Sequence, residues 1–280
     1  MDISVIIPNL NSPIIDKVVR CILDQKTSKS FDVTTVGLDK YKLIPEDPRI
    51  NNINTQNPTP QAISRNTGAF RTSGKLIVFL DADCLADESL LEAHWDAHVK
   101  NSNSLICGSV TFPKKGYLSL CDNVATFHAY LPHLPEGKRR VLPTLNFSIL
   151  RENWQKLGGF DPALPIGEDA ELVQRALGLG MNAFFSPVPK VEHDHNRLNI
   201  SSILQHAWRF GQYSLLLNNF NEGIGLWIKK IVFSVGAPLI ALGIIFKIVI
   251  KSKLPARYWH TLPVVYMAKV TWCLGYAIGK

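Results

Sequence analysis

The sequence predicts an α/β fold with a buried parallel sheet, followed by a hydrophobic helical tail. Two apolar runs, at residues 3–8 and 76–80, have the composition of strands that are buried on both faces. Apolar residues recur at helical spacing over residues 15–25, and residues 33–38 suit a second strand. This strand–helix–strand order is typical of a Rossmann-like half. No GxGxxG follows the first strand, which argues against the usual dinucleotide-binding fold.

The net positive charge of the chain lies entirely in its C-terminal tail. Residues 224–280 contain eight Lys or Arg and no Asp or Glu, whereas residues 1–223 contain 22 basic and 23 acidic residues. A basic, apolar tail on a nearly neutral body favours an anionic membrane surface over nucleic acid, so we expect no nucleic-acid partner. Five scattered cysteines without a CxxC pair fit a cytoplasmic setting, as does an N-terminus without a signal-peptide pattern.

The tail has two apolar stretches. Residues 231–250 are interrupted only by Lys247, and at ~1.5 Å per residue this length spans the ~30 Å of bilayer hydrocarbon. The second stretch, residues 262–279, is shorter. We expect one domain at residues 1–222, followed by a membrane-associated helical hairpin at 223–280. A buried hairpin of core helices is the alternative, and the choice between a spanning and an interfacial pose stays open.

Two carboxylates follow the buried strand at residues 76–80. Asp81 and Asp83 would lie at the carboxyl edge of the sheet, where open α/β sheets bind ligands. Oxygen ligands suit hard divalent cations, which also bind substrate phosphates. A surface loop without a ligand is the alternative for a bare DxD. Arg65, in a helix predicted just before this strand, suits either a phosphate or the Asp81 carboxylate as its partner. A solvated charge on the helix surface is the purely structural alternative.

A second acidic pair, Glu168 and Asp169, begins a predicted helix. Carboxylates favour helix N-termini because of the helix dipole, so the pair has a purely structural explanation. A carboxylate on a loop beside a sheet edge is also well placed to act as a general base.

Two further segments have less specific patterns. Residues 117–145 have weak periodicity and several prolines, which predicts a flexible lid over the site or a surface excursion. His94 and His98 have an i, i+4 spacing that suits zinc, but without a third ligand we expect them to be histidines on a helix surface.

Four separated motifs, in order, resemble those of the family 2 glycosyltransferases, which are inverting enzymes of the GT-A fold. They are Val5-Ile6-Ile7-Pro8 with Asn11; Ser64-Arg65-Asn66-x-Gly68 before Val78-Phe79-Leu80-Asp81-Ala82-Asp83; Gly158-Gly159-Phe160-Asp161; and Gly167-Glu168-Asp169-x-x-Leu172-x-x-Arg175. The resemblance extends over residues 2–215 and implies a mixed, mostly parallel sheet flanked by helices.

The resemblance also implies a donor site with a metal. The residues it assigns to nucleotide-sugar binding are Pro8, Asn11, Asp39, Arg65, Asp81 and Arg209. Asp83, together with Asp81, would hold Mg²⁺ or Mn²⁺ at the diphosphate. One of His193 and His195 would complete the metal or diphosphate site, and the sequence leaves open which one.

On the acceptor side, the resemblance implies that Asp169 deprotonates the acceptor hydroxyl, with Glu168 beside it. Asn146, at the start of a predicted strand, would face the acceptor. No Ser/His/Asp or Cys/His grouping suggests a covalent nucleophile.

The implied function is inverting transfer of a sugar from a nucleotide-diphosphate sugar to a hydroxyl of a glycan or lipid-linked acceptor. The setting would be synthesis of a cell-surface polysaccharide or glycolipid at the cytoplasmic face of the cell membrane. The QxxRW motif of processive members is missing, which favours single addition. The alternatives are transfer to polyprenyl phosphate, which needs no base, and an inactive nucleotide-sugar-binding membrane partner. The intact Asp81, Asp83 and Asp169 argue against the inactive alternative.

Overall fold

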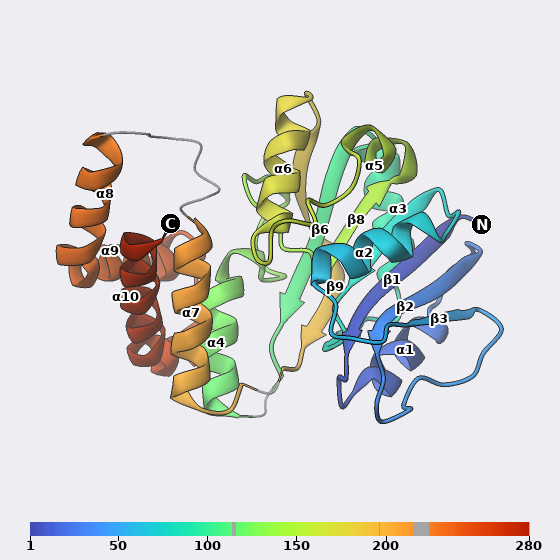
Figure 1. Ribbon diagram of the computed structural model, residues 1–280, viewed down its shortest axis with the longest axis horizontal. Coiled ribbons are helices and arrows are strands. Elements are labelled where there is room, and N and C mark those ends of the chain that lie inside the picture. The colour runs from blue at the N-terminus through green and yellow to red at the C-terminus, as the bar shows by residue number, and fades with distance from the viewer. Residues whose placement is uncertain (114–115, 196, 215–223, 280) are drawn as a thin grey trace. The chain divides into compact units, whose positions relative to one another are not determined.

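The chain folds into two compact units (Figure 1). The computed structural model describes residues 1–113, 116–195, 197–214 and 224–279. We call Met1–Thr111 with Pro135–Asp194 the sheet unit, and Phe112–Leu134 with His195–Lys280 the helical unit. The predicted boundary between residues 222 and 223 lies outside the described residues. The described chain divides elsewhere, because the compact units separate after Asp194 and residues 112–134 join the helical unit.

The sheet unit contains one mixed sheet with the strand order β3-β2-β1-β4-β8-β6-β9-β5, and β7 pairs with β9. The strands are β1 Ile3–Leu10, β2 Phe31–Leu38, β3 Ile50–Asn54, β4 Leu76–Leu80, β5 Cys84–Ala86, β6 Ser104–Thr111, β7 Gly137–Lys138, β8 Asn146–Leu150 and β9 Asn182–His193. The helices are α1 Ile15–Leu23, α2 Gln61–Phe70, α3 Leu90–Lys100, α5 Arg151–Leu157 and α6 Glu168–Gly178.

The direction of the strands determines which residues meet at one edge of the sheet. Strands β3, β2, β1 and β4 are parallel, so the residues that follow β1, β2 and β4 lie at the same edge. Strand β8 is antiparallel to β4, with Asn146 opposite Leu80, and therefore begins at this edge. Both β1 and β4 are buried, as their continuous apolar runs predicted.

A glycine in α2 sets the distance between this helix and the sheet. A Cβ atom on Gly68 would lie 2.5 Å from Cγ2 of Ile6 in β1. Only glycine therefore lets α2 lie this close to the strand, which gives a packing reason for the glycine of the Ser64-Arg65-Asn66-x-Gly68 motif.

The helical unit is made of α4 Tyr117–Phe127, α7 Ile200–Ser214, α8 Ile224–Val235, α9 Ala237–Ile250 and α10 Leu262–Ile278, with the short 3₁₀ helices η1 His128–Tyr130 and η2 Ala256–Thr261. Helix α10 packs along α7 and also contacts α4, α8 and α9 (Figure 1). Its crossing with α7 is close, because a Cβ on Gly211 would lie 2.2 Å from the carbonyl oxygen of Trp272. The predicted tail therefore packs with α4 and α7 and does not form a separate hairpin.

The prediction that residues 117–145 form one flexible lid is wrong, because this segment is divided between the two units. Its first part forms α4 and η1 in the helical unit, where Cys121 and Val124 are fully buried. From Pro135 onward the chain belongs to the sheet unit. Burial of an apolar helix face explains why this segment is an ordered part of the fold.

By length and composition, one described helix, Ala256–Ile278, is long and apolar enough to cross a membrane. Of its most apolar 18-residue stretch, 39% is buried inside the structure. The apolar stretch predicted at 231–250 is not one helix. It is divided at Gly236 into α8 and α9, and Trp227–Val235 and Ala237–Ile250 meet at 79°.

Candidate functional site

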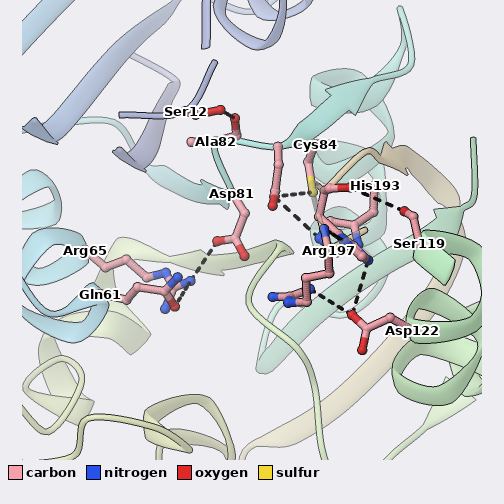
Figure 2. Close-up of polar contacts among 12 residues, drawn as sticks. Ser12, Gln61, Arg65, Asp81, Ala82, Cys84, Ser119, Asp122, His193 and Arg197 are labelled. Carbon is pink, nitrogen blue, oxygen red and sulfur yellow. Dashed lines mark hydrogen bonds and ion pairs between the residues drawn. The ribbon is translucent and has the colours of Figure 1, made fainter. Parts of the chain in front are cut away.

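The loop after β4 is held by contacts from two distant segments of the sheet unit. The Ser12 hydroxyl, just after β1, donates a hydrogen bond of 2.6 Å to the carbonyl of Ala82 (Figure 2). The backbone N–H of Asp81 donates to the carbonyl of Leu145 at 3.2 Å. These bonds fix the backbone of the loop that carries Asp81 and Asp83.

Arg65 connects the two acidic parts of the site. Its buried guanidinium donates to Oδ1 of Asp81 at 2.7 Å and to Oε1 of Glu168 at 2.6 Å. A longer bond of 3.3 Å runs to Gln61, on the same helix (Figure 2). Burial lowers the pKa of Arg65, but the charges of Asp81 and Glu168 outweigh it and leave the pKa raised. The arginine therefore stays charged and bridges the carboxylates.

Two more motifs meet at Asn66, the residue after Arg65. The Asn66 side chain donates to the carbonyl of Phe160 at 2.8 Å and accepts from the Phe160 N–H at 2.9 Å. Arg175 in α6 donates to the carbonyl of Gly159 at 2.9 Å. The Gly158-Gly159-Phe160-Asp161 turn is thus fixed to α2 and α6. Three of the four sequence motifs are therefore joined by hydrogen bonds of Arg65, Asn66 and Arg175.

Asp169 lies in the first turn of α6 next to Glu168. Its Oδ1 accepts a hydrogen bond of 2.7 Å from the N–H of Ala170. Burial, and next the charge of Glu168, raise the pKa of Asp169 to about 7. A carboxylate with a pKa near the working pH is suited to accept a proton from a hydroxyl. Arg65 engages Glu168 and leaves Asp169 as the better candidate for a general base.

The residues Asp83, Cys84 and His193 form a group that fits a divalent cation. One ligand atom from each lies within 4.8 Å of the others, and Nε2 of His193 is 3.5 Å from Oδ1 of Asp83. The antiparallel pairing of β5 with β9 places Cys84 opposite His193. Burial raises the pKa of the Cys84 thiol well above its usual value, which keeps it neutral. The carboxylate and imidazole are therefore the stronger ligands. The carboxylate suits Mg²⁺ or Mn²⁺, whereas the imidazole is a ligand typical of transition metals.

His195 belongs to a different cluster, in the helical unit. Its Nε2 lies 3.2 Å from Oδ2 of Asp122 in α4. Arg197 donates to the same oxygen at 2.9 Å (Figure 2). The other carboxylate oxygen of Asp122, Oδ1, lies 3.1 Å from Nδ1 of His206. Burial raises the pKa of Asp122, but the hydrogen bond and charge of His206 and the charge of Arg197 lower it overall. The geometry associates His193 with the metal group and His195 with Asp122.

Asp122 is a residue that the sequence analysis missed. It is nearly fully buried on α4, in a segment whose periodicity is weak. An acidic residue among apolar helix positions was the available signal, because a buried carboxylate requires partners.

Two residues that were predicted to bind the nucleotide-sugar, Asn11 and Asp39, shape the loop after β2. Oδ1 of Asn11, which has a φ of 56°, accepts a hydrogen bond of 2.8 Å from the N–H of Lys40. Asp39 accepts from the N–H groups of Leu43 and Ile44 at 3.1 and 3.0 Å. Their roles with a nucleotide stay predictions, as does the role of Pro8, which is buried in β1. Arg209 is exposed on α7, and its role also stays a prediction.

The structure places Asn146 in the interior rather than at an open acceptor face. Its side chain is buried and bonds to Nε2 of His94 at 2.8 Å and to the carbonyls of Ser109 and Pro189 at 3.1 Å. The side-chain oxygen and nitrogen of Asn146 therefore both bond to groups inside the sheet unit.

The expectation that His94 and His98 lie on a helix surface is wrong. Both are buried between α3 and the sheet, where the Ser148 hydroxyl bonds to Nδ1 of His94 at 2.8 Å and to Nε2 of His98 at 2.9 Å. Burial lowers the pKa of His94 to about 4 and that of His98 to about 3, so both are neutral at pH 7. The polar residues of β8 supply the partners, and the helix pattern alone did not reveal them.

Comparison with known proteins supports the motif resemblance. Residues 4–120 match the family model described as glycosyl transferase family 2. A "Pre-mycofactocin glycosyltransferase" of Mycobacterium tuberculosis is 24% identical over 140 residues, which are 48% of this chain and 30% of that protein. An "Inactive polypeptide N-acetylgalactosaminyltransferase-like protein 5" of Mus musculus is 25% identical over 189 residues, which are 60% of this chain and 42% of that protein. The chain thus spans less than half the length of these two curated relatives.

Among solved structures, a crystal structure of GalNAc-T7 with UDP, GalNAc and Mn²⁺ aligns with a TM-score of 0.56 at 15% identity. The alignment covers 70% of this chain and 43% of the other. It confirms the predicted α/β fold, with a mixed, mostly parallel sheet flanked by helices, as GT-A-like.

Proposed function

We propose that this chain, whose residues 4–120 match the family model of glycosyl transferase family 2, is a metal-dependent inverting glycosyltransferase. The observation that carries the proposal is the Arg65 bridge. It ties Asp81, beside the candidate metal residues, to Glu168, beside the candidate base. Donor-side and acceptor-side carboxylates are thereby held in one network.

In the proposed reaction, the acceptor hydroxyl oxygen attacks the anomeric carbon of a nucleotide-diphosphate sugar. The bond from that carbon to the diphosphate oxygen breaks, and Asp169 receives the hydroxyl proton. Asp83 and His193, with Asp81 nearby, would hold Mg²⁺ or Mn²⁺, which stabilises the charge of a leaving diphosphate when bound. Arg65 keeps Asp81 and Glu168 oriented and supplies a fixed positive charge between them.

The proposed acceptor is a glycan or lipid-linked hydroxyl, in the synthesis of a cell-surface polysaccharide or glycolipid at the cytoplasmic face of the membrane. The basic, apolar tail supports a membrane location. If the acceptor is instead a polyprenyl phosphate, no base is needed. Asp169→Asn would then leave transfer nearly intact, so this variant distinguishes the two acceptors.

A catalytically inactive partner is the second candidate, and the inactive mouse relative is the observation that favours it. The raised pKa of Asp169 and the candidate metal group favour the enzyme.

The test is isothermal titration of the protein with UDP and with GDP, with and without Mn²⁺. We expect one nucleotide to bind in a Mn²⁺-dependent way and Asp83→Ala to abolish this binding. Asp24→Ala, an exposed aspartate at the end of α1, is the matched control and should bind normally. Release of the nucleotide from its sugar conjugates then separates an enzyme from an inactive binder. Failure to bind any nucleotide by a folded protein would contradict the proposal.

A further inference from the structure

The outer faces of α8 and α9 are built from large apolar side chains. The exposed ones are Trp227, Ile228, Ile231, Val232 and Val235 on α8, and Leu239, Leu242, Phe246 and Ile250 on α9. We call them the apolar stripe. Single exposed apolar residues are ordinary on a protein surface, but nine large ones on two successive helices mark an interaction surface.

The stripe on α9 follows the helical repeat. Its four residues are spaced three, four and four positions apart, which places them on one face at 3.6 residues per turn. The opposite face carries Ala237, Ala241 and Ile248, which are buried against the rest of the helical unit. Helix α9 therefore has one apolar face that the unit covers and one that it leaves exposed.

Neither helix is long enough to cross a bilayer alone. Helix α8 has 12 residues and α9 has 14. At ~1.5 Å per residue they measure ~18 and ~21 Å, against ~30 Å of hydrocarbon. Because they meet at 79°, they do not form one straight span either.

Helix α10 is different, because much of its apolar surface is used inside the unit. Val265 and Cys273 are fully buried, and the glycine crossing packs α10 against α7. Of the large apolar side chains of α10, Met267 and Ile278 are exposed, whereas α8 and α9 together expose the nine of the apolar stripe.

The charges near the stripe indicate which surface it meets. Four basic side chains around the end of α9 are exposed: Lys247, Lys251, Lys253 and Arg257. No acidic residue occurs in residues 224–280. Apolar insertion next to a purely basic set complements a bilayer with anionic headgroups better than it complements a second copy of this basic unit.

We propose that α8 and α9 lie in the plane of an anionic membrane surface, with the apolar stripe inserted at the boundary between headgroups and acyl chains. The proposal deepens the membrane location proposed above and specifies a one-sided attachment without a crossing. It does not depend on the identity of the sugar or the acceptor.

The first experiment is flotation of the full chain with vesicles of phosphatidylcholine, alone or mixed with phosphatidylglycerol. We expect flotation mainly with the anionic vesicles. The paired variant Leu239→Ser with Phe246→Ser should bind at least about tenfold more weakly, because two large apolar side chains are lost from the stripe. The matched control is Leu179→Ser with Phe70→Ser, which removes an exposed Leu and Phe from the sheet unit and should float normally.

The second experiment measures depth. A fluorophore on Leu239→Cys, in a Cys21→Ser background, is exposed to lipids that carry a nitroxide either near the headgroup or near the acyl end. We expect stronger quenching by the nitroxide near the headgroup. Stronger quenching from the acyl end would show a crossing and overturn the in-plane pose, while leaving membrane association intact.

Absence of flotation would overturn both the pose and the membrane location, but not the nucleotide-binding test of the reaction. If the wild-type chain instead self-associates in sedimentation and the paired stripe variant does not, the stripe is an interface between copies. Circular dichroism of each variant separates loss of binding from loss of folding.

Discussion

The sheet unit and the helical unit use their surfaces in different ways. In the sheet unit, buried polar side chains such as Arg65 and Asn66 link motifs that lie far apart in sequence. In the helical unit, the successive helices α8 and α9 expose large apolar side chains. The comparison teaches that long-range polar contacts hold the motifs of the sheet unit together, whereas helical periodicity within each segment places the exposed apolar side chains of α8 and α9.

The largest expected effect tests whether the polar network of the sheet unit is a reaction site. Asp169→Asn removes the proton acceptor while keeping the size of the side chain, so we expect transfer to a hydroxyl acceptor to fall by about 10²–10⁴-fold. Steady-state rates of nucleotide release measure this. The rate of the unmodified chain should fall as the pH drops below about 7, because Asp169 becomes protonated. Unchanged transfer by Asp169→Asn would assign the base elsewhere or indicate a phosphate acceptor.

The next effect concerns the Arg65 bridge. Arg65→Gln leaves Asp81 and Glu168 without their shared cation, so we expect a loss of about 3–5 kcal/mol in the free energy of unfolding. Urea denaturation measures it.

Arg151 provides the matched control for Arg65. Its guanidinium donates to the carbonyls of Gly74 and Ala69 and to the hydroxyl of Thr72, away from the carboxylates of the site. Arg151→Gln should destabilise the fold without changing nucleotide binding. Arg65→Gln should lower the stability of the fold and, under conditions in which it is still folded, also weaken nucleotide binding. Equal effects on binding would show that Arg65 is only a structural residue.

The buried histidines predict an acid sensitivity of the sheet unit. The pKa values of His94 and His98 are lower in the folded chain than the ordinary 6.5, so the unfolded chain binds protons more readily as the pH falls. Their contribution is complete above pH 6.5 and is lost as the pH falls towards about 4 for His94 and about 3 for His98. For His94 alone the loss amounts to up to about 3 kcal/mol. Urea midpoints measured across this range test it, and His94→Gln should flatten the dependence. A midpoint that does not change with pH would contradict the buried, neutral state.

The smallest effect tests the Asn66 link. Asn66→Ala removes both hydrogen bonds to the Phe160 backbone, and we expect a loss of about 1–3 kcal/mol. Amide hydrogen exchange should rise at Phe160, whose N–H loses its acceptor. Thr67→Ala, at the next position on α2 and half-buried, is the control and should leave this amide protected, because the Thr67 hydroxyl donates to the carbonyl of Ile63 and not to Phe160. If protection at Phe160 survives in Asn66→Ala, another group holds the turn.

Much of the fold followed from local patterns, because continuous apolar runs and helical periodicity report burial directly. The pairing of Arg65 with Asp81 was one of two predicted alternatives, and the structure confirms it. The link from Arg65 to Glu168 was not predicted, since these residues are 103 positions apart and no local pattern records such contacts. Asp122 was missed for the same reason, because its partners come from other segments.

The path of the chain between the two units has a practical consequence for dissecting the protein. The backbone passes from one unit to the other three times, after Thr111, Leu134 and Asp194. A single proteolytic nick at any of these points leaves at least one fragment that contains parts of both units. Truncation after Asp194 would likewise leave residues 112–134 without the α7 and α10 helices they pack against. A clean separation of the units requires a rearranged gene in which residues 112–134 are rejoined to the segment from His195 onward.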